Sequence, residues 1–213
     1  MKRHGLLAAA LALVTAVTMA GLAAAPDQLT LRLRLEKGRT YGIKVASVQK
    51  VAQSVMGLDQ VVTQTVGLGY RLAVTEVDPV GVMTGQCTYD SCFFKQEGPL
   101  GAVEYDSASP PELVPEAARG FAALVGLGFT IRLDPTGRTV GIAGLDAMIA
   151  RMLERMGLSE GTDRDQAAQT LKNQYGDEAM KRSLGSMFWQ YPERPLSVGE
   201  SWTNETRVSV GFP

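Results

Sequence analysis

The first half of the chain alternates apolar and polar residues with the two-residue period of β-strands. Leucine occupies every odd position from 29 to 35 and polar residues lie between. In residues 58–75 most apolar residues fall on even positions; these are Leu58, Val62, Val66, Leu68, Tyr70, Leu72 and Val74. Gly57 and the pair Asp78-Pro79 mark turns between such segments. The predicted strands are 28–36, 41–55, 58–75, 80–95 and 102–105. Short turns join them, which predicts an antiparallel meander.

The second half changes to the period of helices. The clearest helix has apolar residues at i, i+3, i+4, i+7, i+8 and i+11 and ends at Gly157; they are Leu145, Met148, Ile149, Met152, Leu153 and Met156. Three further helices are predicted: one between Ser109 and Gly126, one over 162–175, and one from Asp177 with Met180, Leu184, Met187 and Phe188 on one stripe. A hairpin over 129–142 and a last strand over 202–210 complete the pattern.

These elements predict an α+β fold, with a long-stranded, curved, half-barrel-like antiparallel sheet and three to four helices packed on one of its faces. Two rows of side chains are expected to be buried against the helices: Leu29, Leu31, Leu33 and Leu35, and Leu68, Tyr70, Leu72 and Val74. Residues 24–213 are expected to form one domain. No closing element follows residue 210, which leaves a complete domain and a fragment of a longer protein both open.

Residues 1–23 are predicted to be a secretory signal peptide. Lys2 and Arg3 precede an uncharged run from Gly5 to Ala25, and Gly21-Leu22-Ala23 fits the small-x-small rule for cleavage. The competing interpretation is a membrane anchor, but glycines and threonines dilute the run and no basic cluster follows it. No second apolar segment approaches the length of a membrane span. We therefore expect a bacterial protein exported to the periplasm or outside the cell, with no integral membrane segment after cleavage.

The composition argues against several classes of function. The 213 residues are 45% hydrophobic and 20% charged, with a net charge of −1 and no Lys/Arg run longer than two. This balance argues against nucleic-acid binding. The one histidine, His4, lies in the predicted leader, so the mature chain would have no Ser-His-Asp or Cys-His catalysis and no His-ligated metal. We expect no metal, no cofactor and no catalytic residues.

Three local features admit alternatives. Glu104 and Asp106 share one strand face about 7 Å apart, a spacing seen in glycosidase pairs, although a solvated strand end and a cap explain them as well. The glycine pair Gly67 and Gly69 predicts a bend or bulge in a curved sheet.

Cys87 and Cys92 would meet an oxidising compartment after export. On one continuous strand they would point to opposite faces and could not be bridged, whereas a hairpin loop between them would allow a disulfide.

Methionines concentrate on the predicted helices. Five of the seven outside the leader lie between 148 and 187. Methionine adapts to irregular apolar surfaces, so these residues are either ordinary core or the lining of a pocket for an apolar molecule. The candidate pocket residues are Tyr70, Met148, Met152, Met156, Met180 and Met187.

Four segments together resemble a bacterial family of exported proteins with a domain of unknown function. They are Leu35–Tyr41 (LEKGRTY), Val103–Ser107 (VEYDS), Phe129–Gly137, and Pro195–Trp202 (PLSVGESW). The resemblance implies further strands beyond residue 213 and supplies no catalytic residues. The expected fold is also similar to periplasmic lipoprotein-carrier and lipid-binding proteins, an analogy of fold alone.

The sequence therefore predicts a non-enzymatic protein of the cell envelope that binds a lipid, another apolar ligand or a partner's apolar segment between sheet and helices. The alternative is a structural or interaction protein with a filled core. A carboxylate-based hydrolase is the least favoured class.

Overall fold

The structure is a computed structural model that describes residues 28–55, 58–99, 101–158, 160–188 and 190–205. The predicted leader, residues 1–23, lies outside this part of the chain. Within it, no helix combines the length and the apolar character needed to cross a membrane.

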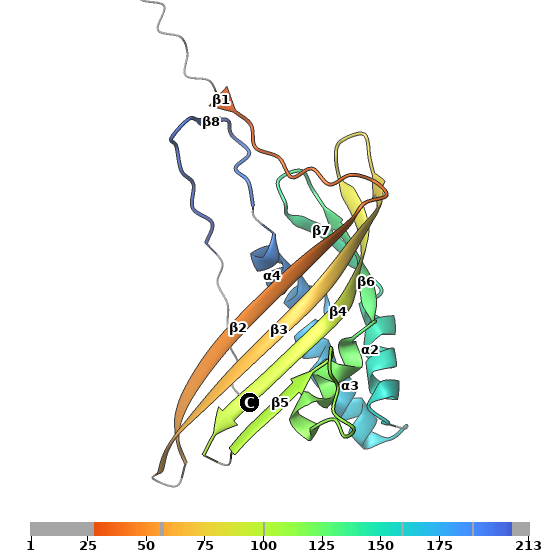
Figure 1. Cartoon of the computed structure of the whole chain (residues 1–213). Coiled ribbons are helices and arrows are strands. Elements are labelled where there is room, and N and C mark those ends of the chain that lie inside the picture. The colour runs from red at the N-terminus through yellow and green to blue at the C-terminus, as the bar shows by residue number, and fades with distance from the viewer. Residues whose placement is uncertain (1–27, 56–57, 100, 159, 189, 206–213) are drawn as a thin grey trace, which may run out of the picture.

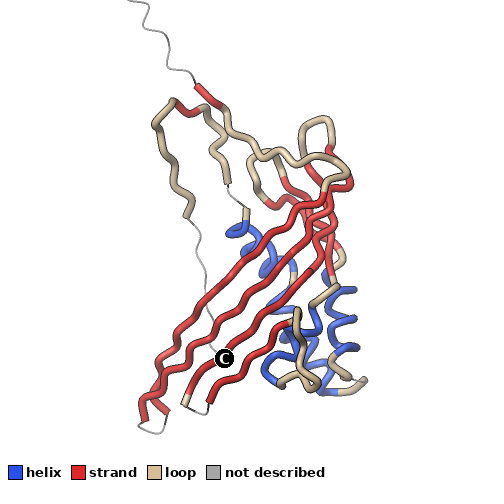
Figure 2. Tube along the Cα trace, in the orientation of Figure 1, coloured by secondary structure: helices blue, strands red, loops and turns tan. Residues whose placement is uncertain are grey.

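One antiparallel sheet of six strands dominates the molecule, and its edges do not close into a barrel (Figures 1 and 2). Its strands are β2 (Thr40–Val55), β3 (Leu58–Val77), β4 (Met83–Gly98), β5 (Gly101–Asp106), β6 (Gly128–Leu133) and β7 (Thr139–Ala143). The order across the sheet is β2-β3-β4-β6-β7, and β5 also pairs with β4. The predicted meander and its hairpin at 129–142 are confirmed.

The helices gather on one face of this sheet, which we call the inner face (Figure 1). They are a short 3-10 turn η1 (Glu116–Ala118) and the helices α1 (Arg119–Leu124), α2 (Leu145–Arg155), α3 (Thr162–Tyr175) and α4 (Asp177–Met187). The predicted α+β class with helices on one face is therefore confirmed. The helix expected after Ser109 is shorter than predicted, because residues 109–115 are irregular.

The main core lies between the inner face and α2, α3 and α4. The predicted β3 row is confirmed, since Tyr70, Leu72 and Val74 are buried and Leu68 packs against the core. Side chains directly opposite across the ladders extend this row, because Leu72 pairs with Cys87 and Tyr70 pairs with Tyr89. The alternation of residues 58–75 thus places one continuous apolar row under the helices.

The leucine row at 29–35 differs from the prediction. Only β1 (Gln28–Leu29) is a strand there, and it pairs with β8 (Leu196–Ser197), not with the main sheet. Leu29 is 58% exposed, whereas Leu33 and Leu35 pack against the main core. Residues 30–36 cross one end of the sheet without joining its ladder, and the backbone N–H of Leu33 donates instead to the carbonyl of Pro135 at 2.7 Å. Period-two alternation therefore marks an extended segment here, but not a sheet strand.

The strand predicted at 202–210 is not formed where it is described. Residues 202–205 have no regular structure, and residues 206–210 lie outside the described part. The Trp202 indole N–H donates to the carbonyl of Gln190 at 3.0 Å, and its ring packs on Tyr191. These contacts hold the segment against the chain that follows α4.

A β-bulge corrects the prediction for the two cysteines. β4 is one continuous strand, as expected, and both thiols are free. However, Asp90 is an extra residue between the pairs Tyr70–Tyr89 and Gly69–Ser91. This insertion shifts the alternation by one position, so Cys87 and Cys92 both point to the inner face and both are buried. Their predicted placement on opposite faces is wrong, and the irregularity predicted at the glycine pair is found beside Gly69.

Candidate functional site

The candidate pocket residues pack together in the described core. Tyr70, Met148, Met152 and Met180 are each no more than 5% exposed and belong to one cluster. Met156 is partly buried at its border. The side chain of Met187 lies outside the described part, although its backbone ends α4. The helix-covered half of the inner face is thus a packed interior.

Polar atoms are nevertheless present in this interior. The rings of Tyr70 and Tyr89 lie 4.8 Å apart, and their hydroxyls form a hydrogen bond within the apolar cluster. Burial raises the pKa of both phenols well above the usual value, and it raises the pKa of Tyr175 on α3 to about 12. Pairing the two hydroxyls offsets the loss of water around them. These tyrosines stay neutral at any physiological pH.

The inner face continues beyond the helices, along β2 and β3. Across this stretch Val45 pairs with Leu68 and Val51 pairs with Val62. Val45 is 38% exposed, and Val51 and Val62 are half-buried. The polar neighbours on the same face are neutral; they are Ser47, Gln49, Gln60 and Gln64. We call these residues, with the three valines, the open stretch.

Charge separates the two faces of the sheet. Every described inner-face side chain of β2, β3 and β4 is uncharged. The opposite, outer face carries both signs; its charged residues are Lys44, Lys50, Arg71, Glu76, Asp90, Lys95, Glu97, Glu104 and Asp106. The open stretch therefore presents valine, serine and glutamine side chains on two neighbouring strands without any charge, a surface that can accept an apolar or neutral occupant.

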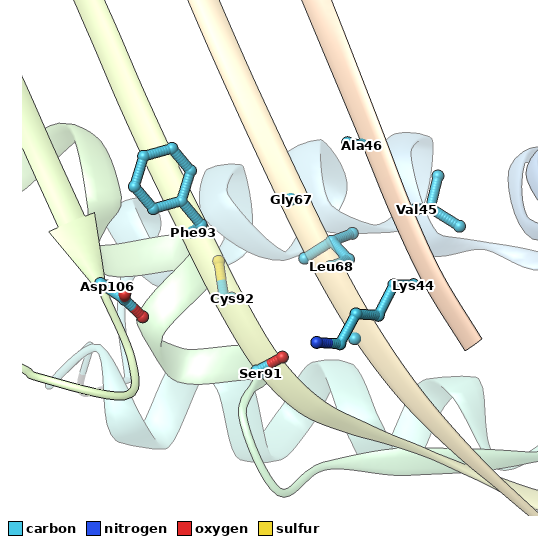
Figure 3. Close-up of a pocket in the computed structure, with 10 residues that line it drawn as sticks. Lys44, Val45, Ala46, Gly67, Leu68, Ser91, Cys92, Phe93 and Asp106 are labelled. Atoms are coloured by element: carbon cyan, nitrogen blue, oxygen red, sulfur yellow. The ribbon is translucent and has the colours of Figure 1, made fainter. Parts of the chain in front are cut away.

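The outer face has a shallow depression of about 280 Å³ above two glycines (Figure 3). Gly67 and Gly69 have no side chains and so leave the β3 backbone bare. A Cβ at position 69 would overlap the Ser91 hydroxyl. Phe93 and Asp106 border it on one side, and the Lys44 side chain extends over β3 from the other. Sequence reasoning found the glycine pair but interpreted it only as a bend, and so missed the depression.

The carboxylates Glu104 and Asp106 lie on the outer face, on the same side of β5 as predicted. Asp106 Oδ1 accepts the backbone N–H of Ala108 at 2.8 Å, and the Asp106 carbonyl accepts the N–H of Ser109. These are the contacts that the cap interpretation predicts. Within the described residues, no group of three or more His, Cys, Asp or Glu side chains is arranged to hold a metal ion.

Residues 81–213, more than half of the chain, match the family of unknown function DUF6263. The chain belongs to this family. Three of the four motifs that carried the resemblance lie inside the match, whereas Leu35–Tyr41 precedes it. No curated protein and no solved structure matches the chain.

The DUF6263 match begins just before β4 and includes all the described helices. The strands β2 and β3, which carry the whole open stretch, precede it. The match therefore includes the helices and the β4 and β6 residues of the packed core, whereas the β3 residues of that core and the exposed inner face of the β2–β3 hairpin lie outside it.

Proposed function

We propose that this DUF6263 protein is an exported, non-enzymatic protein of the bacterial cell envelope that holds a lipid or another apolar ligand against the inner face of its sheet. The observation that carries the proposal is the open stretch. Apolar side chains continue there from the packed core into solvent without any charged residue among them.

The helix-covered half supports the sheet without offering room to a ligand. Met152 and Leu184 are at most 1% exposed, and Phe129 is equally buried. A ligand placed among them would have to displace close-packed side chains. The adjoining surface of Val45, Val51 and Val62 requires no such displacement. Burying the apolar area of these valines under an acyl chain would gain roughly 25 cal/mol for each Å² removed from water.

A structural or interaction role is the second candidate, and the same filled interior favours it. A protein whose helices and sheet are already packed can act as a rigid module, with the open stretch covered by an apolar segment of a partner. The two candidates differ in one measurable property, which is affinity for a small apolar molecule.

Binding of N-phenyl-1-naphthylamine, followed by its fluorescence, tests the proposal. The protein is expected to enhance the fluorescence, and Val62→Lys is expected to weaken the binding at least tenfold, because the ammonium group would be buried under the probe. Val61→Lys is the matched control, since Val61 is the sequence neighbour on the outer face and is 44% exposed. No enhancement by the wild type, or equal loss in both variants, would reject ligand binding and leave the interaction role.

Export is tested separately, by the intact mass of the protein recovered from the periplasm or the medium of a bacterial host. Loss of about 23 residues, as the small-x-small rule predicts, supports the envelope location. An uncleaved chain that remains in the cytoplasm would contradict it.

A further inference from the structure

A groove of about 360 Å³, which we call the α1–α2 groove, lies between the first two α-helices and shares no residue with the open stretch. Its apolar lining includes Leu113 before α1, Ala122 within α1 and Met156 at the end of α2. Ala122 packs against the smaller apolar cluster around Phe94, whereas Met156 packs against the main core, so the groove follows the boundary between the two. Its volume falls within the range of small-molecule sites, about 300 to 1,000 Å³.

The charged residues that line the α1–α2 groove are both arginines, Arg119 on α1 and Arg155 on α2. Neither guanidinium forms an ion pair with a carboxylate of the described chain. The acidic residues of the neighbouring turn and helix, Glu116 and Glu154, do not line the groove. Two positive charges beside an apolar floor are complementary to an anion that carries an apolar part.

Contacts with α1 hold the Arg155 guanidinium in place. Its Nη1 donates to the carbonyl of Ala123 at 3.0 Å and to that of Val125 at 2.6 Å, where α1 ends. These bonds use one nitrogen, whereas Nε and Nη2 donate to no group of the described chain and keep their N–H donors for a ligand. A guanidinium that is already held loses little side-chain freedom when it binds an anion.

We propose that the α1–α2 groove binds a single-chain amphiphile with an acidic head group, a carboxylate or a phosphate. Arg119 and Arg155 bind the acid through charge-assisted hydrogen bonds. The alkyl chain covers Ala122 and Met156, and it contacts Leu113, whose side chain is otherwise 80% exposed. This site recognises a charge, whereas the open stretch carries none, so it does not rest on the proposed function.

Isothermal titration calorimetry with four probes tests the proposal. Sodium octanoate and octyl phosphate, both below their critical micelle concentrations, are expected to bind, and the tighter of the two identifies the head group. Octanol has a chain of the same length without the charge and should bind at least tenfold more weakly, because it makes no charge-assisted hydrogen bond. Inorganic phosphate has the charge without the chain and should also bind at least tenfold more weakly than octyl phosphate.

Arg119→Gln is the variant that decides the site, because the side chain is exposed and its replacement leaves the buried residues of α1 in place. It should weaken the binding of octanoate at least tenfold. Arg155→Gln would also remove the hydrogen bonds to α1, so its effect would combine binding with stability. Arg151→Gln is the matched control, since Arg151 is an exposed arginine on α2 that does not line the groove. It should bind octanoate as the wild type does, and urea denaturation checks that each variant is folded.

Four results would overturn the proposal. The first is no binding of either acid, and the second is equal affinity for an acid and for the matching probe that lacks its charge or its chain. The third is equal loss in Arg119→Gln and Arg151→Gln, which would indicate a general attraction to positive charge. The fourth is octanoate binding that Val62→Lys weakens and Arg119→Gln does not, which would place the ligand on the open stretch and leave the proposed function intact.

Discussion

Arg71 on β3 and Asp90 on β4 form an ion pair, with 2.7 Å between Arg71 Nε and Asp90 Oδ1, at the residue where β4 departs from regular pairing. Asp90 is the extra residue of the bulge, and its carboxylate is on the outer face with Arg71. On one edge β4 pairs with β3 on both sides of the bulge. On its other edge it pairs with β6 before the bulge and with β5 after it. The bulge therefore allows one strand to serve two neighbours while keeping its apolar residues under the helices.

Deleting Asp90 should destabilise the protein far more than removing its charge. Without the extra residue, every side chain from Ser91 onward would change face, and Phe94, which is 1% exposed and stacks on Phe121, would point to solvent. We expect the deletion to cost more than about 3 kcal/mol of unfolding free energy. Asp90→Ala removes only a half-exposed ion pair and should cost about 0.2 to 1 kcal/mol. Urea denaturation measures both, and similar values for the two variants would contradict the role of the bulge.

The thiols of Cys87 and Cys92 should be unbridged and slow to react in the native protein. Burial raises the pKa of Cys87 to about 12 and that of Cys92 to about 11, so almost no thiolate forms at pH 8. A thiol-specific reagent such as DTNB should therefore react slowly with the folded protein and rapidly with two thiols in denaturant. Alkylation in denaturant without reductant should add two groups to the intact mass. A mass with no added group would show a disulfide and contradict the structure.

Gly128 should not tolerate even a methyl group. At this position, where β6 meets β4, a Cβ would overlap the backbone carbonyl oxygen of Cys87, which cannot move without breaking the ladder. We expect Gly128→Ala to lower the unfolding free energy by about 1 to 3 kcal/mol. Gly141→Ala is the control, because its Cβ would lie an ordinary 3.5 Å from the Arg132 side chain. That substitution should be neutral or stabilising, since alanine restricts the unfolded chain. A control that is equally destabilised would point to a general loss of glycine flexibility.

Sequence periodicity was sufficient for the sheet, the helix faces and the buried row around Tyr70, because local alternation decides which side of a strand meets the core. It failed where pairing depends on distant residues. Leu29 alternates as well as Leu72 does, but its partner is Leu196 and not the main sheet. The bulge at Asp90 has no local signal strong enough to show that Cys92 shares a face with Cys87. The open stretch exists because the helices cover only part of the inner face. The pattern of residues 41–55 shows which side chains share a face, but not which part of that face the helices cover.

Met152 should be the most sensitive of the helix methionines. Its side chain is fully buried in the main core, whereas Met156, one turn further along, is only partly buried at the border. Met152→Ala is expected to cost about 2 to 5 kcal/mol, because a cavity remains in packed surroundings. Met156→Ala should cost clearly less, since the border can collapse or admit water. Denaturant titration of both variants makes the comparison, and a larger loss in Met156→Ala would contradict the packing described for α2.

The turn at Asp134 should give the protein an acid-sensitive part of its stability. Burial alone would raise the pKa of the Asp134 carboxyl, but hydrogen bonds from Thr136 and Arg138 outweigh it and lower the pKa below its usual value of 3.8. Oδ1 accepts the Thr136 hydroxyl at 2.6 Å and the Thr136 backbone N–H at 2.8 Å. Because the folded pKa is the lower one, this stabilisation is complete above the usual value and disappears as pH falls through the folded pKa.

Asp134→Asn should therefore lower the unfolding free energy at pH 7 by about 1 to 3 kcal/mol, the contribution of hydrogen bonds to a charged group. The difference from the wild type should shrink as the pH falls below 3.8, where the carboxyl of the unfolded chain takes up a proton, and disappear once the pH is below the lower pKa of the folded protein. Urea denaturation at pH 7, 5 and 3 measures the trend, and Glu112→Gln, at an exposed position, should show no difference at any of these values. A difference between Asp134→Asn and wild type that stays constant from pH 7 to 3 would mean that the charge of Asp134 does not stabilise the turn.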